Sequence, residues 1–315
     1  MSDFNQPVSG NDLARFAGLQ TFMRLPDAPT PEGLDVGFIG VPMDIGTSWR
    51  SGTRFGPKQL RQESAMIRPY NIQTGAAPFD SLQCADLGDI AINTFNLADS
   101  LSIIQKTYED ILKHPFIPMG LGGDHSMTLP ILRAMAKKHG PLALVHVDAH
   151  ADVNDEMFGE RETHGTVFRR AYEEGLLVPS KVWQIGIRGT GYTAEDFTEA
   201  ADWGFNQRLA SSLWHKPMDT LGKEVVESIR GHPTYFTYDI DSLDPSFAPG
   251  TGTPEIGGLT TMQAMELIRN LRGLNIVGGD LVEVSPPYDT TGNTALTGAN
   301  IMFEMLSILP GVKYR

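Results

Sequence analysis

One short stretch, residues 144–152, constrains this chain more than any other part of its sequence. It reads L-V-H-V-D-A-H-A-D, an apolar run followed by Asp148, His150 and Asp152 at every second position. Side chains alternate between the two faces of a strand, so a strand that continued through this stretch would point all three the same way. Carboxylates are rarely buried without partners. The stretch therefore predicts a buried strand that ends in a metal-binding site.

Short apolar runs and longer amphipathic segments alternate along the chain. We expect strands at residues 36–41, 82–85, 116–121, 142–147, 182–187, 234–238 and 275–284, and helices from near residue 57 and at 97–113, 126–138, 218–229, 262–271 and 294–309. This alternation predicts the α/β class, with a largely parallel sheet covered by helices on both faces. No linker or repeat divides the 315 residues. We therefore expect a single domain over residues 1–315, with an irregular N-terminal arm of about residues 1–34.

Composition narrows the range of partners. The net charge of -13 and the isoelectric point near 5.0 disfavour nucleic acid and anionic membranes, which would repel the chain, and favour a divalent metal or a cationic small molecule. The single cysteine, Cys84, suits a reducing compartment, and no apolar run is as long as a membrane span. The first residues also lack the pattern of a secretion signal. We expect a cytoplasmic protein.

Three further segments place ionisable side chains at the ends of expected strands, where α/β sheets bind their ligands. They are G-G-D-H-S with His125, Y-D-I-D-S-L-D-P with Asp239 and Asp241, and L-V-E-V with Glu283. Each of these residues alone would have an ordinary structural explanation, such as a helix cap or a surface ion pair. Together with residues 144–152 they indicate one shared site.

The charge of this set indicates two metal ions. Asp148, Asp152, Asp239 and Asp241 would bring four negative charges together, which raises their pKa values and destabilises the fold unless cations neutralise them. Two divalent ions would do so, with some carboxylates bridging both ions. Nitrogen and oxygen ligands without a thiolate favour manganese, and zinc, iron and cobalt also fit. Such a pair activates water for attack on an electrophilic carbon or phosphorus.

Three motifs resemble those of the ureohydrolases, the arginase and agmatinase family. They are G-G-D-H, D-A-H-A-D and Y-D-I-D-S-L-D-P, and the resemblance extends from G-V-P-M-D-I-G-T through R-S-G-T-R-F-G-P to E-V-S-P-P-Y-D. The resemblance implies an arginase-like three-layer α/β/α fold with a mostly parallel eight-stranded sheet. It also implies two Mn²⁺ ions in each subunit, hydrolysis of a guanidino compound to urea, and assembly into homotrimers or homohexamers.

The resemblance also implies a role for each residue of the site. One ion would be held by His125, Asp148, Asp152 and Asp239, and the other by His150, Asp148, Asp239 and Asp241. His164 matches the family's proton-shuttling histidine, and Glu283 matches the acid that receives the guanidinium. The expected catalytic residues are therefore His164, Glu283 and Asp152.

The chemistry of a guanidinium agrees with these roles. Its carbon is a poor electrophile because the charge is spread over three nitrogens, so the attacking water must be activated by metal. Glu283 could hold the planar cation by paired hydrogen bonds, and His164 titrates in the range needed to protonate the leaving amine. His146 matches no ligand of the family and is expected to pack in the core. His114, His139, His215, His232, Trp49 and Trp183 are also expected to be structural, although Trp49 could wall the substrate channel.

The loop at residues 153–163 is expected to contact the far end of the substrate. Its acidic residues suit the ammonium tail of agmatine, whereas Asn154 or Arg161 could bind the carboxylate of 4-guanidinobutyrate, and Met157 could pad the alkyl chain. Three other runs, R-P-Y-N, T-G-A-A-P-F-D and P-P-Y-D-T-T-G-N, resemble guanidinobutyrases more than agmatinases. We therefore favour 4-guanidinobutyrate over agmatine and 3-guanidinopropionate. A hypothesis of another class is a metal-binding protein of this fold without turnover.

Overall fold

The computed structural model describes residues 4–191, 193 and 195–315. Eight strands form one sheet in the order β2-β1-β3-β8-β7-β4-β5-β6, and all seven pairings are parallel. The strands are β1 (Val36–Val41), β2 (Cys84–Asp89), β3 (Ile117–Gly122), β4 (Leu142–Val147), β5 (Leu177–Ile187), β6 (Asn206–Leu209), β7 (Pro233–Asp239) and β8 (Asn275–Val282). The expected eight-stranded sheet is confirmed.

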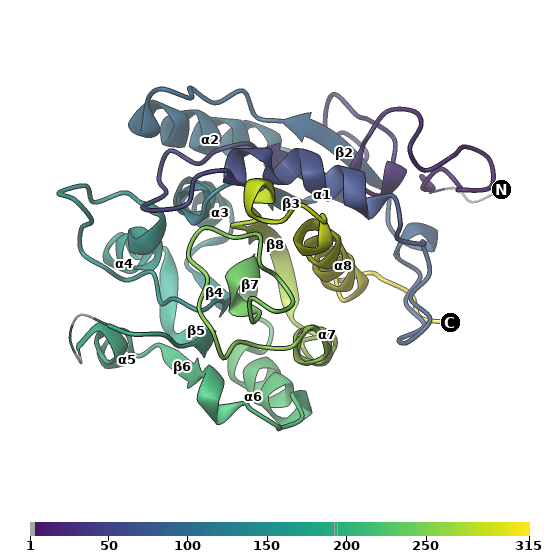
Figure 1. The fold of residues 1–315 in the computed structure, drawn as a ribbon. Helices are drawn as coiled ribbons and strands as arrows, with labels where there is room; N and C mark the ends of the chain where they lie inside the picture. The colour runs from purple at the N-terminus through teal and green to yellow at the C-terminus, as the bar shows by residue number, and fades with distance from the viewer. Residues whose placement is uncertain (1–3, 192, 194) are drawn as a thin grey trace.

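Helices cover both faces of this sheet (Figure 1). They are α1 (Gly56–Ser64), α2 (Leu97–Ile111), α3 (Thr128–His139), α4 (Val167–Glu173), α5 (Glu199–Asp202), α6 (Asp219–Ile229), α7 (Thr261–Asn270) and α8 (Asn293–Ser307). Helices α1, α8, α7 and α6 pack in succession on one face, and α2, α3 and α4 pack on the other. The expected three-layer α/β/α fold is therefore confirmed.

Side chains on the two faces of the sheet fill two separate hydrophobic cores. In β1, Val36 and Phe38 belong to the core under α1 and α8, whereas Ile39 and Val41 belong to the core under α2 and α3. Strand β4 divides its side chains in the same way. Because both faces are covered, nearly every side chain of β1 and β4 is apolar and buried, as expected for the interior of a parallel sheet.

The sequence-based predictions miss short or polar elements. Strand β6, N-Q-R-L, lies at the edge of the sheet and has no apolar run, and the short helices α4 and α5 show too few turns for a clear periodicity. Strand β5 begins at Leu177, five residues before its apolar half. Strand β8 ends at Val282 rather than at residue 284, because the backbone of Glu283 adopts a left-handed conformation with φ of 64°.

The segment before β1 lies against the body of the molecule. Within the described residues its one helical element is the 3-10 helix Phe22–Arg24, and Phe22 inserts into the core with its ring centroid 4.4 Å from that of Phe38. Farther out, the side chain of Asn5 donates a hydrogen bond of 3.0 Å to the carbonyl of Cys84. Within the described residues, no helix has the length and apolarity needed to span a membrane.

Candidate metal centre

The predicted site residues gather at the carboxyl ends of four neighbouring strands in the middle of the sheet, β3, β8, β7 and β4. The turn after β3 carries His125, the residue after β8 is Glu283, β7 ends at Asp239 with Asp241 just beyond it, and the loop after β4 carries Asp148, His150 and Asp152. Parallel strands all end at the same edge, so residues far apart in the chain meet there.

The local backbone differs from the simple alternation that the sequence suggested. Strand β4 ends at Val147, and Asp152 has a left-handed φ of 53°, so Asp148, His150 and Asp152 converge through a turn rather than along a strand. In the same way, Asp241 lies in a 3-10 turn, and its backbone N–H donates a hydrogen bond of 2.8 Å to the carboxylate of Asp239. The expected convergence is present, but it is made by turns that begin where the strands end.

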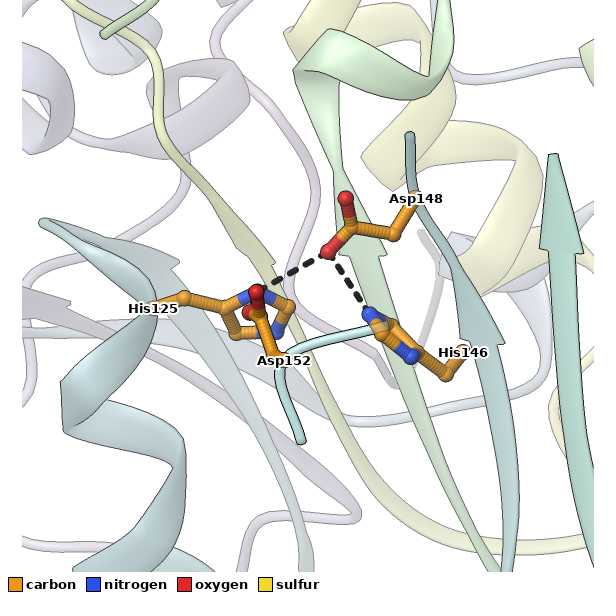
Figure 2. Close-up of side chains that lie close together, drawn as sticks. All are labelled: His125, His146, Asp148 and Asp152. Carbon is orange, nitrogen blue, oxygen red and sulfur yellow. Dashed lines mark hydrogen bonds and ion pairs between the residues drawn. The ribbon is translucent and has the colours of Figure 1, made fainter. Parts of the chain in front are cut away.

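One group of side chains surrounds Nδ1 of His125. This atom lies 3.0 Å from Asp152 Oδ2, 3.2 Å from Asp148 Oδ2 and 3.4 Å from Asp239 Oδ2. Figure 2 shows how the side chains of His125, Asp148 and Asp152 point toward one another. Nε2 of His125 is already engaged, because it lies 2.9 Å from the hydroxyl of Thr237. Nδ1 therefore faces three carboxylates, and one ring proton could serve only one of them.

A second group is centred on Nδ1 of His150. It lies 3.2 Å from Asp241 Oδ2 and 3.5 Å from Asp148 Oδ1. Asp148 thus contributes one carboxylate oxygen to each group. The two groups are therefore adjacent, as two ions bridged by one carboxylate would require.

Electrostatics explain why this donor set suits cations. Burial raises the pKa of Asp239 well above its usual range, and the charges of Asp241 and Asp148 raise it further. The pKa of Asp241 is raised as well, first by burial. Divalent ions would keep these carboxylates ionised, and neutral imidazole and carboxylate donors are ligands that manganese, zinc, iron and cobalt accept. The residues present fit a two-metal centre.

His164 and Glu283 lie side by side next to the first group. Nδ1 of His164 is 3.5 Å from Glu283 Oε1, and its Nε2 is 2.7 Å from the hydroxyl of Ser48. Glu283 Oε1 also accepts a hydrogen bond of 2.9 Å from the backbone N–H of His125. The other oxygen, Oε2, is buried and has no hydrogen-bond partner among the described residues. A Cβ added at Gly252 would lie 3.4 Å from Oε2, so this glycine keeps the space beside it open.

Glu283 also sets the protonation of its neighbours. Burial lowers the pKa of His164, but the hydrogen bond and charge of Glu283 outweigh burial and raise that pKa to about 9. Burial and the charge of Glu283 raise the pKa of Asp124 to about 6. An imidazole that retains a proton next to a carboxylate with an unpaired oxygen is suited to proton transfer to a bound cationic substrate.

A cleft of about 400 Å³ leads to the metal centre. His150, Asp152 and Asn154 line it, together with Asp155 from the same loop after β4 and with charged residues of the segment after β5 and of helices α4 and α5: Arg188, Asp196, Arg169 and Glu199. The amide of Asn154 donates a hydrogen bond of 3.0 Å to the carbonyl of Gly165.

The other two residues expected at the substrate's far end, Met157 and Arg161, lie outside the lining of this cleft. Arg161 pairs with Glu173 at 3.1 Å and with Asp155 at 3.2 Å, and Met157 packs against Gly165. The roles of Asn154, Met157 and Arg161 in binding remain predictions.

Sequence reasoning missed three polar contacts of the site. His146 was expected only to pack, but its Nε2 lies 2.7 Å from Asp148 Oδ2 (Figure 2). The signal was present, because His146, near the end of β4, stands two residues before Asp148. Ser48 contacts His164 and Thr237 contacts His125, and neither could have been found from spacing because the partners are more than 100 residues apart.

Three of the side chains that were expected to be structural, those of Trp183, Trp49 and His232, lie in different surroundings. Trp183 is buried in the core under α6, as expected. Trp49 is 67% exposed, and the guanidinium of Arg50 stacks on its ring at 4.6 Å. His232 lies 2.9 Å from the carbonyl of Pro141, remote from the metal centre. Trp49 lies outside the residues that line the cleft.

Comparison with known proteins agrees with this site. The model of the arginase family matches residues 34–307. The chain is 60% identical to the guanidinobutyrase of Pseudomonas aeruginosa over 99% of both chains, and 55% identical to the mitochondrial agmatinase of Gallus gallus over 99% of this chain and 92% of that protein. The solved structure of proclavaminate amidinohydrolase from Streptomyces clavuligerus superposes with a TM-score of 0.88, at 41% identity, over 93% of this chain and 97% of that one.

Proposed function

The chain belongs to the arginase family, and from this premise we propose that it is a two-metal amidinohydrolase that hydrolyses 4-guanidinobutyrate to urea and 4-aminobutyrate. The observation that carries the proposal is the buried, unpartnered oxygen of Glu283 beside the histidine and aspartate groups. Similarity to a guanidinobutyrase along nearly the whole chain supports this choice of substrate.

The proposed metal ligands are the residues of the two groups, with Asp148 and Asp239 proposed to serve both ions. His125, Asp148, Asp152 and Asp239 would hold one ion, and His150, Asp148, Asp239 and Asp241 would hold the other. When bound, the ions would supply water activated for attack at neutral pH. Manganese is the proposed metal because the donor set contains oxygen and imidazole nitrogen but no thiolate.

Glu283 would bind and orient the guanidinium. Its Oε1 is held by the backbone N–H of His125, so its Oε2 is left to accept hydrogen bonds from the planar cation. Because Gly252 has no side chain, the substrate can approach this oxygen closely. The carboxylate would thereby place the guanidinium carbon next to the metal ligands Asp152 and Asp239.

His164 would deliver the proton that the departing amine needs. The backbone N–H of Ser48 donates to Nε2 at 3.2 Å, so the ring proton would sit on Nδ1, 3.5 Å from Glu283 Oε1, and the hydrogen bond and charge of Glu283 hold the pKa of this histidine above its usual range. The hydroxyl of Ser48, 2.7 Å from Nε2, fixes the ring in place. Asp152, a ligand that also contributes its charge near His164, completes the proposed catalytic set.

The far end of the substrate would contact the loop that follows Asp152. Asn154 lines the cleft, Met157 would pad the alkyl chain, and Arg161 would bind the carboxylate after exchanging one of its present carboxylate partners. Agmatine is the second candidate, because three acidic residues of the cleft, Asp155, Asp196 and Glu199, favour an ammonium tail. Similarity to an agmatinase also supports this alternative, and 3-guanidinopropionate is a shorter acid that the same loop could accept.

Urea release tests the proposal. The protein loaded with Mn²⁺ would be assayed with 4-guanidinobutyrate, 3-guanidinopropionate, agmatine and arginine at equal concentrations. We expect the highest kcat/KM with 4-guanidinobutyrate. A preference for agmatine would overturn the proposed substrate but keep the reaction, whereas no urea from any compound would support a metal-binding protein without turnover.

We also propose assembly into homotrimers or homohexamers and a cytoplasmic location. Leu209, Trp214 and Ile256 are exposed apolar side chains that line a hollow of about 770 Å³, which a second copy of the chain could cover. The one cysteine, Cys84, is buried and unpaired, which suits a reducing compartment. Light scattering that gives the mass of a single chain would contradict the assembly, and recovery of the protein outside the cytoplasmic fraction would contradict the location.

A further inference from the structure

His146 lies within the metal centre although it has no place in the proposed ligand set. It is fully buried, and its nearest ring nitrogen falls in one group with the donor atoms of His125, Asp148 and Asp152, all within 4.8 Å of one another. Figure 2 shows His146 beside the carboxylate of Asp148. Its Nε2 is therefore either an additional metal ligand or a hydrogen-bond donor to Asp148.

The hydrogen bonds of Gln184 and Gln207 decide between these roles. The amide nitrogen of Gln184 lies 2.7 Å from the carbonyl of Ala151 and 3.1 Å from Nδ1 of His146, and the amide oxygen of Gln184 accepts a hydrogen bond of 3.0 Å from Gln207. A carbonyl can only accept, so the atom of Gln184 that faces Ala151 must be the NH₂ group. The same NH₂ group therefore donates to Nδ1 of His146.

An imidazole whose Nδ1 accepts a hydrogen bond carries its proton on Nε2. Nε2 of His146 thus donates to Asp148 Oδ2 at 2.7 Å and has no lone pair left for a cation. The ring is also fixed from the side, because that of Phe168 packs against it with centroids 4.2 Å apart. His146 is consequently a rigid donor aimed at one oxygen of Asp148.

We propose that His146 is a positioning residue that orients Asp148 toward both metal positions, and that Gln184 and Gln207 orient His146. Asp148 is the carboxylate whose two oxygens face different histidines, His125 and His150. A rotation of this carboxylate would disturb both positions together. The inference rests on the proposed two-metal centre, whose ligands it leaves unchanged.

Replacement of His146 by two different residues tests the role through metal binding alone. In His146→Gln the terminal amide can place an N–H near the position of Nε2, whereas His146→Leu has no donor. We expect wild type to bind two Mn²⁺ per chain, His146→Gln to bind both with nearly the wild-type dissociation constants, and His146→Leu to bind both about 10- to 100-fold more weakly. Chelator competition measures these constants without any assay of activity.

Gln184→Met provides a second route, because it keeps the side-chain length and removes the hydrogen bonds to His146 and Ala151. We expect it to weaken the binding of both ions, but by a smaller factor than His146→Leu does. The matched control is Asn206→Leu in β6, next to Gln207. Among the described residues, the amide of Asn206 bonds only to the carbonyls of Ser180 and Val182. Asn206→Leu should bind Mn²⁺ as wild type does.

Absorption of the Co²⁺-loaded protein separates positioning from ligation, because the visible bands of Co²⁺ report the atoms bound to it. His146→Gln and Gln184→Met should keep the wild-type band positions. The inference is overturned if His146→Gln shifts the bands and loses one ion, as a direct ligand would. It is also overturned if His146→Leu binds Mn²⁺ as tightly as wild type. If His146→Leu does not fold, wild-type Mn²⁺ affinity in Gln184→Met overturns the inference instead. Wild-type protein that binds no ion would instead contradict the metal centre itself, and this inference with it.

Discussion

Nδ1 of His164 lies 3.5 Å from Oε1 of Glu283, and both side chains are buried beside the metal centre. The pair links the residue proposed to deliver a proton with the residue proposed to bind the guanidinium. Substrate bound at the free Oε2 of Glu283 would therefore meet its proton donor at the same carboxylate. The first two predictions concern this pair.

Glu283→Gln should reduce kcat/KM for the preferred guanidino substrate by about 30-fold to several thousand-fold, because a buried cation loses its charged partner. It should also lower the pKa of His164 from about 9 in metal-free protein, since the negative charge of Glu283 favours the imidazolium. A titration of the His164 ring followed by NMR measures this shift. Glu304→Gln, a buried glutamate paired with Arg269 away from the site, is the control and should leave both quantities unchanged. An unaltered His164 pKa in Glu283→Gln would contradict the coupling.

His164→Asn should lower kcat by about 10²- to 10⁴-fold with little change in KM, because it removes a general acid but no proposed contact to the substrate's tail. Ser48→Ala keeps the imidazole and removes only the hydroxyl at Nε2, so its loss should be smaller. Steady-state kinetics on both variants decide the point. A larger defect in Ser48→Ala than in His164→Asn would argue against His164 as the proton donor.

Asp239→Asn should bind neither ion at its wild-type strength, because this carboxylate is proposed to bridge both. Metal analysis after dialysis against micromolar Mn²⁺ would count the ions retained. Asp244→Asn is a matched control from the segment after β7, since among the described residues the carboxylate of Asp244 accepts hydrogen bonds from Ser246 and from the backbone of Gly257 and Gly258, none of which is a proposed metal ligand. Retention of both ions by Asp239→Asn would rule out the bridging role.

Chelation should lower the melting temperature of the wild-type protein, and added Mn²⁺ should restore it. Without cations, burial and then the charges of Asp241 and Asp148 disfavour the ionised carboxylate of Asp239, as its raised pKa indicates. An ion supplied at 100 times its dissociation constant stabilises the folded state by about 3 kcal/mol. Differential scanning calorimetry at several Mn²⁺ concentrations measures this. A melting temperature independent of Mn²⁺ would speak against a metal centre in the folded protein.

Asp289→Asn should destabilise the fold at neutral pH by about 1 to 2 kcal/mol, the lower figure allowing for screening by water. Burial raises the pKa of Asp289, but hydrogen bonds from Thr291 and Thr294 outweigh burial and lower it to about 2. A carboxyl with a lowered pKa stabilises the fold above its unfolded pKa of about 4, and this contribution disappears as the pH falls toward 2. Urea unfolding of the wild type and of Asp289→Asn from pH 7 to pH 3 should therefore show a difference in the free energy of unfolding that shrinks as the pH falls. A difference that stays constant with pH would contradict the assignment.

Much of the fold could be predicted because the strands next to the site are buried on both faces. Val36–Val41 and Leu142–Val147 are nearly uniform apolar runs, and the structure has strands with those bounds. Strand β6 could not be predicted, because its residues N-Q-R-L become a strand only by pairing with β5. The local sequence does not indicate which strand will lie beside it.

The ionisable residues of the site could also be identified from sequence, since each motif follows a predicted strand. Their geometry could not. Asp148, His150 and Asp152 were expected to share a strand face, but they converge through a turn in which Asp152 has a positive φ. His146 was expected only to pack, and the contacts of Gln184 with both His146 and Ala151 show otherwise.

By itself the sequence determined the α/β class, the family and the residues with the chemistry to bind metal and guanidinium, because burial pattern and motif spacing are local properties. Tertiary structure decided which of these residues meet. Strand β8 lies between β3 and β7, so Glu283 arrives within hydrogen-bonding distance of His125, 158 residues away. Strand β5 lies beside β4, which brings Gln184 under His146. Strand order depends on how buried faces pack across the whole chain, and no local pattern encodes it.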